Sequence, residues 1–356
     1  MSKLFSEVAL RSLTSRNRIM VSPMCQYSSE DGFATNWHLV HLGSRAVGGA
    51  GIVMSEATAV SPEGRISYAD LGIWKDEHLP KLKQITEFVK DQGAIPAIQL
   101  AHAGRKASKN KPWEGNEYIT PEKEGWDIVA PSAIPFKEDA PVPKEMEKHD
   151  IEKVIEDFVA AAKRALKAGF EIAEIHAAHG YLLHEFCSPV SNDRSDKYGG
   201  SFENRIRLVL EVTEAVREVW PAELPLFVRI SATDWLPERE SWTIEDSVNL
   251  SKELKKRGVD LIDVSSGGLV PEQKVDGGPG FQMPFAEQIK REAEIATGAV
   301  GIITQAQQAE TILRTEQADL IIMAREFLRD PYFPLHAADN LRDNIEWPNQ
   351  YKRAKP

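Results

Sequence analysis

The feature of this sequence that most limits its possible folds is a series of eight short apolar runs rich in β-branched residues, separated by longer stretches with the apolar spacing of amphipathic helices. A strand and a helix in alternation, eight times over, are the pattern of a closed barrel of parallel strands. We therefore predict an α/β fold, a single (β/α)8 TIM barrel, with a doubly wound open sheet as the alternative. The runs cover residues 18–24, 51–60, 94–100, 171–176, 224–231, 261–265, 300–304 and 320–324.

The clearest helical stretch follows residue 150. We predict that Asp150 is the N-cap of this helix and that Gly169 ends it. Apolar side chains that fall on one helical face stand at Ile151, Val154, Ile155, Phe158, Ala161, Ala162 and Ala165.

The 356-residue chain contains no linker rich in Gly, Ser or Pro, so we expect one domain over residues 1–356. Residues 8–13 precede the first run and are expected to form a hairpin that caps the bottom of the barrel. An irregular insertion, rich in proline, covers about 103–148 after the third run. Barrel enzymes build their sites from loops after strands, so we predict an active-site loop or lid, with a surface excursion as the alternative. Residues 341–356 form a polar tail.

The composition excludes several classes of function. Lys and Arg total 43 against 54 Asp and Glu, and a net charge of -11 disfavours binding to nucleic acid or anionic membranes. No segment is apolar for the ~18 residues of a membrane span, and the N-terminus lacks the apolar core of a secretory signal. Only Cys25 and Cys187 are present, too few for a disulfide framework or an iron–sulfur cluster. We therefore expect a cytoplasmic protein.

The residues most suited to chemistry lie directly after the fourth run, where His176, His179 and Tyr181 fall within six positions. Two imidazoles and a phenol at the end of a strand can supply hydrogen-bond donors and a proton at one point in space. The histidines could instead bind a metal, but the sequence shows no third ligand at matching spacing. We predict an acid–base and hydrogen-bonding site and no metal.

This turn reads His-x-x-His-Gly-Tyr, and residues 194–205 read Arg-x-Asp-x-Tyr-Gly-Gly-Ser-x-Glu-Asn-Arg. The chain resembles the old yellow enzyme family, in which both motifs occur together. A Pro-Met-Cys-x-Tyr segment at residues 23–27 resembles the thermophilic-like subclass of NADPH dehydrogenases and ene-reductases, similar to xenobiotic reductase A. The resemblance implies a barrel that binds FMN tightly and oxidises NADPH or NADH. The 192–205 run is expected to be structural, with Ser201 as a helix cap.

The resemblance also implies roles for the reacting side chains. His176 and His179 would hold the carbonyl or nitro oxygen of an activated alkene, and Tyr181 would give a proton to its α-carbon. Tyr27 would contact the substrate. Arg353, within a Tyr-x-Arg segment that begins at Tyr351, would reach into the site of a neighbouring subunit, which implies a homodimer or homotetramer.

The FMN contacts that the resemblance implies follow several of the predicted strands. Arg229 would face the N1 and O2 edge of the flavin, where a cation stabilises the anionic reduced ring. Family members usually have glycine at the positions of Ala306 and Ala324, near the phosphate. Alanine fits there if its φ is negative and its β-carbon points away from the phosphate. The implied cofactor residues are Ser22, Pro23, Met24, Cys25, Ala57, Gln99, Arg229, Gln305, Ala306, Ala324 and Arg325.

The resulting hypothesis is an FMN-dependent, NAD(P)H-oxidising ene-reductase that acts on α,β-unsaturated carbonyl or nitro compounds and also on quinones or xenobiotics. One alternative is a flavin-free barrel isomerase or lyase, in which the histidines and Tyr181 do acid–base work. Another is a flavin-binding redox sensor without catalytic activity, with Cys25 as the sensing thiol. The sequence contains no dinucleotide fingerprint from which to distinguish NADPH from NADH.

Overall fold

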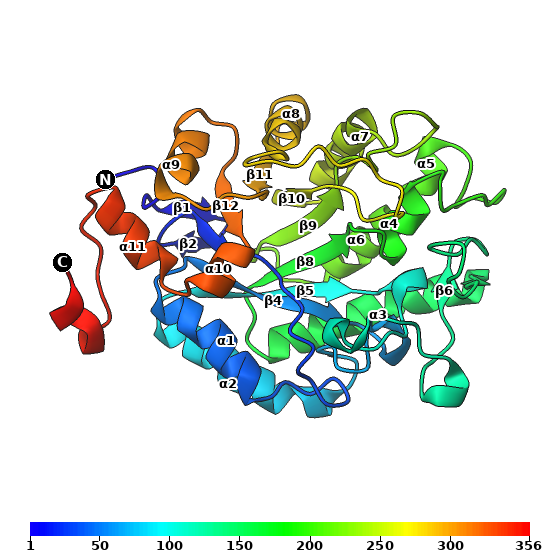
Figure 1. Cartoon of the computed structure of the whole chain (residues 1–356), viewed down its shortest axis with the longest axis horizontal. Helices are drawn as coiled ribbons and strands as arrows, with labels where there is room; N and C mark the ends of the chain where they lie inside the picture. The colour runs from blue at the N-terminus through cyan, green and yellow to red at the C-terminus, as the bar shows by residue number, and fades with distance from the viewer.

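A computed structural model describes the whole chain, residues 1–356. Its central feature is a closed barrel of eight strands, all paired in parallel, in the order β10-β11-β12-β3-β4-β5-β8-β9. The predicted TIM barrel is confirmed, and the open-sheet alternative is wrong (Figure 1). The barrel strands are β3 (Ile19–Val21), β4 (Ile52–Ala59), β5 (Ile95–Ala101), β8 (Ile172–Ala177), β9 (Leu226–Ser231), β10 (Leu261–Ser265), β11 (Ala296–Ala299) and β12 (Leu320–Met323).

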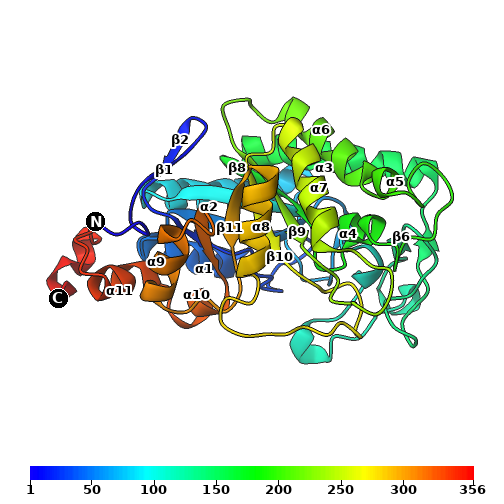
Figure 2. The same ribbon diagram turned by 90° about the horizontal axis from the view of Figure 1, so that it is seen from above.

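Helices surround the strands, as Figures 1 and 2 show from two directions. Each barrel strand is followed by at least one helix before the chain returns to the sheet. Short helices follow β8 and β12 at the end of the barrel where the site lies. The helices are α1 (Asn36–Val47), α2 (Leu79–Asp91), α3 (Lys148–Lys167), α4 (Leu182–Cys187), α5 (Phe202–Arg205), α6 (Arg207–Val219), α7 (Ile244–Lys256), α8 (Met283–Ala293), α9 (Ala306–Arg314), α10 (Arg325–Arg329) and α11 (Phe333–Asn340).

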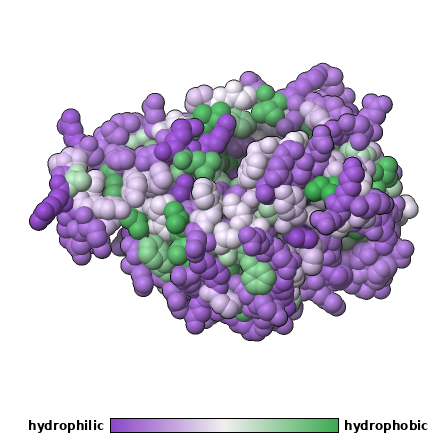
Figure 3. All heavy atoms as spheres, turned by 60° about the horizontal axis from the view of Figure 1, so that its bottom comes forward, coloured by the Kyte–Doolittle hydropathy of each residue, from purple (hydrophilic) through white to green (hydrophobic).

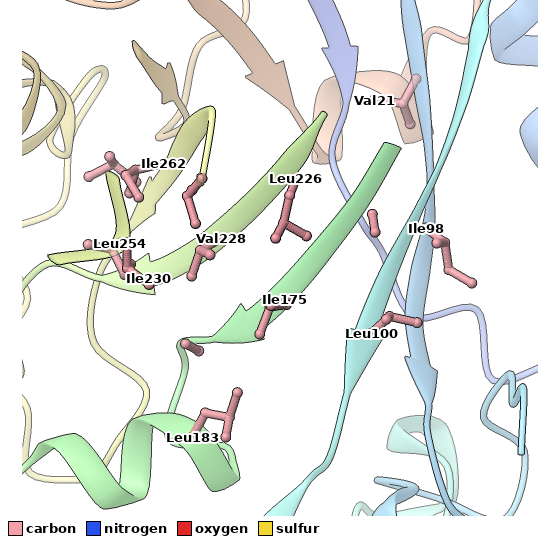
Figure 4. Packing of buried hydrophobic residues seen from close by; sticks show 14 of the residues in the cluster. Val21, Ile98, Leu100, Ile175, Leu183, Leu226, Val228, Ile230, Leu254 and Ile262 are labelled. Carbon is pink, nitrogen blue, oxygen red and sulfur yellow. The ribbon is translucent and has the colours of Figure 1, made fainter. Parts of the chain in front are cut away.

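Side chains alternate along each strand between two apolar layers. A cluster of 71 buried residues fills the space between strands and helices. Figure 4 shows part of it, with Ile175, Val228 and Ile262 on three neighbouring strands. A second cluster of 11 residues, among them Met20 and Phe227, fills the barrel below the site. Each fully buried aliphatic or aromatic side chain contributes about 1.5–3 kcal/mol, so the barrel is a packed support for its mouth.

The N-terminal hairpin is confirmed. Strands β1 (Val8–Leu10) and β2 (Leu13–Ser15) pair antiparallel, and Leu10 belongs to the cluster inside the barrel. The partly buried Val8 and Leu13 pack against the same cluster. The hairpin therefore closes the bottom of the barrel, opposite the site.

The predicted seventh strand was misplaced. The run 300–304 is more apolar than its neighbours, but the strand is β11 (Ala296–Ala299), which pairs with β10 and β12 through small residues. Gly301 has φ +138° and Ile302 has φ +50°, and neither value fits an extended strand. Residues 300–304 instead form the loop that leads to α9, at the edge of the site.

The start of α3 was also placed three residues late. Glu147, not Asp150, is the N-cap, and Asp150 stands at the third helical position of a capping box. In that box, Asp150 Oδ2 accepts from the Glu147 backbone N–H at 2.9 Å. An acidic residue suits either position, which explains the error. Gly169 follows the helix with φ +88°, as expected for a C-terminal stop.

The insertion after the third barrel strand lies between β5 and α3. It contains the 3-10 turns η3 (Gly104–Lys106), η4 (Pro112–Glu114) and η5 (Pro121–Lys123) and the two-residue strands β6 (Val129–Ala130) and β7 (Lys144–Glu145). Its first residues, Arg105 and Lys106, hydrogen-bond to backbone carbonyls in the loop after β10. The insertion therefore joins the wall of the barrel mouth. The remaining 3-10 turns are η1 (Pro62–Gly64), η2 (Asp76–His78) and η6 (Asn349–Ala354).

Candidate active site

The fold brings His176, His179 and Tyr181 together at the carboxyl end of β8. The ring centroids of His176 and His179 are 5.2 Å apart, and those of His176 and Tyr181 are also 5.2 Å apart. Both pairs are nearly perpendicular, with interplanar angles of 83° and 78°. The three polar side chains therefore surround one small region at the barrel mouth.

The turn that presents these rings requires glycine at position 180. Gly180 has φ +69°, and a β-carbon there would lie 2.3 Å from the Gly268 carbonyl oxygen. His179 itself has φ +59°, an uncommon value outside glycine. Its backbone N–H donates to Ser231 Oγ at 2.9 Å, and its Nε2 lies 2.7 Å from Ser265 Oγ. Contacts with β9 and β10 thus hold the turn in this conformation.

Both imidazoles are neutral near pH 7. Burial, together with the positive charge of Arg229, lowers the pKa of His176 and of His179 well below the usual value. A neutral imidazole carries one N–H donor. His176 Nδ1 is buried and has no hydrogen-bond partner within the protein, so its hydrogen-bonding capacity is unused. No cluster of three His, Cys, Asp or Glu side chains with metal-binding geometry is present.

Tyr181 is protonated and lies close to Lys106, a residue that the sequence analysis did not assign to the site. Burial raises the pKa of Tyr181 well above its usual value. Lys106 Nζ lies 4.9 Å from the centre of the Tyr181 ring and donates to the carbonyl oxygens of His179 at 2.8 Å and Gly268 at 2.9 Å. Burial lowers the pKa of Lys106 to about 7. The one sequence signal that could have assigned Lys106 to the site is its position shortly after the third barrel strand.

The segment after β3 lies across the same mouth. Ser22 Oγ accepts from Arg229 Nη1 at 3.3 Å, which joins this segment to β9. Glu56 Oε2 accepts from the Gln26 backbone N–H at 2.9 Å, and Glu56 Oε1 lies 3.1 Å from His38 Nε2, both side chains being buried. Pro23, Met24 and Cys25 lie between these two anchors and are each partly buried.

Cys25 and Tyr27 are uncharged. Burial, with the nearby carboxylates of Asp70 and Glu56, raises the pKa of the Cys25 thiol. Since a thiol reacts as its thiolate, this environment disfavours the sensor alternative. Burial, with smaller contributions from Cys25 and Tyr181, also raises the pKa of Tyr27. Tyr27 is therefore a neutral phenol near Tyr181, the predicted proton donor.

Below these groups, a layer of polar side chains crosses the barrel interior. It comes from the neighbouring strands β5, β8, β9 and β10. Ala57 on β4 pairs with Gln99 on β5. Gln99 Nε2 donates to Glu174 Oε1 at 2.8 Å, and Arg229 Nε lies 3.3 Å from Asp263 Oδ2. Arg229 therefore has a carboxylate partner. Glu174 and Asp263 were not predicted, although Glu174 stands two residues before His176 and so shares its face of the strand.

A cavity of about 320 Å³ lies beside the ends of β10 and β12 and the loop after β11. Ala324 and Arg325 line it, together with Thr304, whereas Gln305 and Ala306 stand one and two residues beyond the lining. The other lining residues are Ser265, Phe281, Gln282, Val300, Gly301, Ile302, Ile303, Ile322, Met323, Glu326 and Arg329.

Two helices begin beside this cavity without a side-chain cap. Gln305 precedes α9 and Ala324 precedes α10, and neither side chain bonds a backbone N–H of its helix. The free N–H groups and Arg325 together suit a phosphate group. Ala324 has φ -106°, and Ala306 is not among the residues of positive φ, so neither position needs glycine. A negative φ, one of the two conditions for alanine at these positions, is therefore met at both.

Two of the predicted elements do not belong to the cluster of His176, His179 and Tyr181. Tyr351 and Arg353 belong to the exposed turn η6, near the C-terminus at one end of the molecule (Figure 1). Tyr351 Oη lies 3.4 Å from Tyr332 Oη. They are not part of the site formed by their own barrel.

The 192–205 run is structural: Asn192 donates to the Phe186 carbonyl oxygen at 2.7 Å, and Ser201 caps α5.

Comparison with known proteins identifies the family. Residues 3–344 match the Oxidored_FMN family, described as NADH:flavin oxidoreductase / NADH oxidase. The chain is 54% identical over 352 residues to an NADPH dehydrogenase of Geobacillus sp. (strain WCH70), covering 98% of both chains. It is 51% identical over 355 residues to an NADPH dehydrogenase of Bacillus cytotoxicus, covering 99% of this chain and 97% of that one.

Solved structures agree with this assignment. Morphinone reductase in complex with tetrahydroNAD is 28% identical and superposes with a TM-score of 0.78, covering 98% of this chain and 93% of that one. An old yellow enzyme homologue from Zymomonas mobilis is 26% identical with a TM-score of 0.78, covering 97% and 94%. The resemblance to old yellow enzymes, the enzymatic nature of the protein and its use of FMN and a nicotinamide donor are confirmed. The chain belongs to the NADH:flavin oxidoreductase / NADH oxidase family of FMN-dependent barrel enzymes.

Proposed function

We propose that this FMN-dependent oxidoreductase is an ene-reductase that reduces the activated C=C bond of α,β-unsaturated carbonyl or nitro compounds with NADPH. The observation that carries the proposal is a cluster of three uncharged groups at the barrel mouth: the buried imidazole of His176, the partly buried imidazole of His179 and the protonated phenol of Tyr181. The ring centroids of His179 and Tyr181 are each 5.2 Å from that of His176. This arrangement suits an acceptor that develops negative charge on one oxygen and needs a proton nearby.

The residues around the cavity fit FMN. The free N–H groups at the starts of α9 and α10, with Arg325, would hold its phosphate, while Gln305 and Ala306 supply backbone at the start of α9. Ala57, Gln99 and the segment Ser22–Cys25 would hold its ring system. When bound, FMN supplies a site that accepts hydride from NADPH and passes it to the acceptor. Arg229 would face the ring edge that becomes negative.

The histidines and Tyr181 would act on the acceptor. His176 Nδ1 has no hydrogen-bond partner within the protein, whereas His179 is held by Ser231 and Ser265 before the substrate arrives. Their N–H groups would donate to the substrate oxygen and stabilise its negative charge. Tyr181 would then give its phenolic proton to the α-carbon, and Tyr27 would contact the substrate from the other wall.

The family excludes the flavin-free isomerase or lyase alternative, and quinones and xenobiotics stay within the proposed range of acceptors. The relatives named NADPH dehydrogenase favour NADPH as the donor. The complex of morphinone reductase with tetrahydroNAD supports a nicotinamide site in this fold. We further propose that the whole chain, residues 1–356, works as one FMN-binding unit in the cytoplasm. The structure contains no helix long and apolar enough to cross a membrane.

We also propose a homodimer or homotetramer in which Arg353 of one subunit contacts substrate in another. The support is that Arg353 and Tyr351 are exposed on a tail outside their own site. In addition, Trp37 and Val40 of α1 are 56% and 67% exposed, which is unusual for large apolar side chains. Figure 3 shows apolar groups among hydrophilic ones on the face that carries α1 and α2.

An absorption spectrum of the purified protein, followed by anaerobic additions, tests the proposal. We expect a flavin band that bleaches with NADPH and returns with 2-cyclohexenone. A protein that binds no FMN even after reconstitution contradicts the cofactor assignment. A flavin that NADPH reduces and oxygen reoxidises, but no enone or nitroalkene does, contradicts the ene-reductase proposal and leaves the family assignment intact.

A further inference from the structure

Asp263 is a buried carboxylate with few polar neighbours. Its side chain on β10 is fully buried, and neither of its oxygens has a hydrogen-bond partner. Its one close ionic neighbour is Arg229, whose Nε lies 3.3 Å from Asp263 Oδ2. Burying a carboxylate without hydrogen bonds is costly, so the surrounding charges decide what Asp263 does.

Those charges come from β9, which pairs with β10, and from β8, the next strand beyond β9. β9 contributes Arg229, and β8 contributes Glu174, which is also fully buried. The other titratable groups near Arg229 are His176 and His179, whose lowered pKa values leave them neutral. On the other side of β10, Asp263 pairs in register with Gly298 of β11. Because glycine has no side chain, this position supplies no group that could neutralise the charge of Asp263. The cation whose charge acts on Asp263 is Arg229.

The two carboxyl groups of this layer differ in charge. Burial and the neighbouring Asp263 raise the pKa of Glu174 to about 8, whereas burial raises that of Asp263 to about 6, held down by Arg229. Near pH 7, Asp263 is therefore the charged member and Glu174 the neutral one. The same Arg229 reaches the cofactor side of the barrel through its Nη1, which donates to Ser22 Oγ at 3.3 Å.

We propose that Asp263 sets the reduction potential of the bound FMN: its carboxylate offsets part of the charge of Arg229 and keeps the midpoint potential lower than Arg229 alone would make it. This inference rests on the proposed function, because it requires the flavin ring to lie against Arg229. Reduction places negative charge on the ring, and a fixed negative charge nearby disfavours that state. In the buried interior, solvent screens this repulsion only weakly.

A lower potential favours one half of the reaction over the other. Hydride transfer from the reduced ring to an alkene becomes more favourable, whereas hydride transfer from NADPH to the oxidised ring becomes less so. Asp263 would therefore adapt the flavin to acceptors that are difficult to reduce. Asp263 acts through Arg229 and touches no substrate, so it is a positioning and charge-setting residue.

The test is the midpoint potential of FMN in Asp263→Asn, measured at pH 7.5 by equilibration with reference dyes. Asparagine preserves the shape of the side chain and removes the charge. We expect the midpoint potential to rise, anaerobic reduction by NADPH to become faster, and reoxidation by 2-cyclohexenone to become slower. The matched control is Glu174→Gln, the same kind of substitution in the same layer, which should shift the potential much less because Glu174 already carries a proton.

A potential in Asp263→Asn equal to that of the wild type, with FMN bound, overturns the inference. If that variant does not fold, the pH dependence of the midpoint potential in Glu174→Gln decides, because this variant lacks the carboxyl group that titrates near pH 8. Reduction should raise the pKa of Asp263, so the midpoint potential of Glu174→Gln should fall more steeply with rising pH just above pH 6 than above pH 8. A slope that stays constant over this range overturns the inference. A wild-type protein that binds no FMN contradicts the proposed function instead.

Discussion

The imidazole of His176 meets the phenol ring of Tyr181 edge to face, with the ring centroids 5.2 Å apart and the planes at 78°. His176 comes from the end of β8, whereas Tyr181 lies immediately before α4, and the intervening turn passes against the backbone at Gly268. An oxygen acceptor held by His176 therefore has the Tyr181 proton within reach, and the roles of the two side chains can be separated by experiment.

Replacing Tyr181 with phenylalanine should separate the two half-reactions. Reduction of the flavin by NADPH should continue, because it needs no proton from Tyr181. Reduction of 2-cyclohexenone should slow by about 10²- to 10⁴-fold, the usual contribution of a positioned general acid. Anaerobic stopped-flow measurement of each half-reaction checks this. An equal loss in both would count against Tyr181 as the proton donor.

Replacing His176 with alanine should weaken the binding of a phenol, whose phenolate oxygen resembles the oxygen of the developing enolate. Losing one hydrogen bond to a charged oxygen should raise the dissociation constant by about 10- to 100-fold. Calorimetric titration gives the constant, and His176→Asn, which keeps an N–H donor, should recover part of the affinity. Unchanged binding in His176→Ala would rule out its contact with the ligand oxygen.

The stability of the protein should depend on pH through Glu174. The folded pKa of about 8 lies above the ordinary 4.5, so the folded state retains a proton that the unfolded state loses. This contribution to stability is complete below pH 4.5 and declines as the pH rises to about 8. Glu174→Gln keeps a hydrogen-bonding group at the position but cannot lose a proton.

We therefore expect Glu174→Gln to gain stability relative to the wild type, by more than about 1 kcal/mol, between pH 5 and pH 8. Urea unfolding of both apoproteins at these two pH values provides the comparison. Glu185 has a similarly raised pKa, but it is present in both proteins and its effect cancels. A difference between the two proteins that does not change with pH would contradict the assignment.

Gly180→Ala should disturb the site itself. Its φ of +69° disfavours alanine, and the added β-carbon would lie 2.3 Å from the Gly268 carbonyl oxygen. We expect a loss of stability of about 1–3 kcal/mol together with weaker phenol binding, since the turn must shift. Gly200→Ala is the matched control: its φ is +78°, and nothing lies within 4 Å of the added β-carbon. It should lose some stability and keep its affinity for phenol.

Local patterns determined most of the fold. The alternation of apolar runs and amphipathic helices predicted the barrel, the apolar residues 8–13 predicted the hairpin, and the short motif from His176 to Tyr181 identified one cluster at the mouth. These features are encoded in neighbouring residues, because strand and helix periodicities act over a few positions. The errors were also local: at 300–304 hydropathy was strong, but the backbone at Gly301 and Ile302 leaves the strand.

The surroundings of that cluster depended on the tertiary structure. Lys106 donates to the carbonyl oxygens of His179 and Gly268, which come from two other loops. Arg229 on β9 pairs with Asp263 on the neighbouring strand β10. No spacing in the sequence reveals these contacts, because closing the barrel is what brings the ends of distant strands to one mouth. Burial in that mouth then sets the charges of the histidines, Tyr181 and Asp263, since the cost of removing a charge from water depends on everything packed around it.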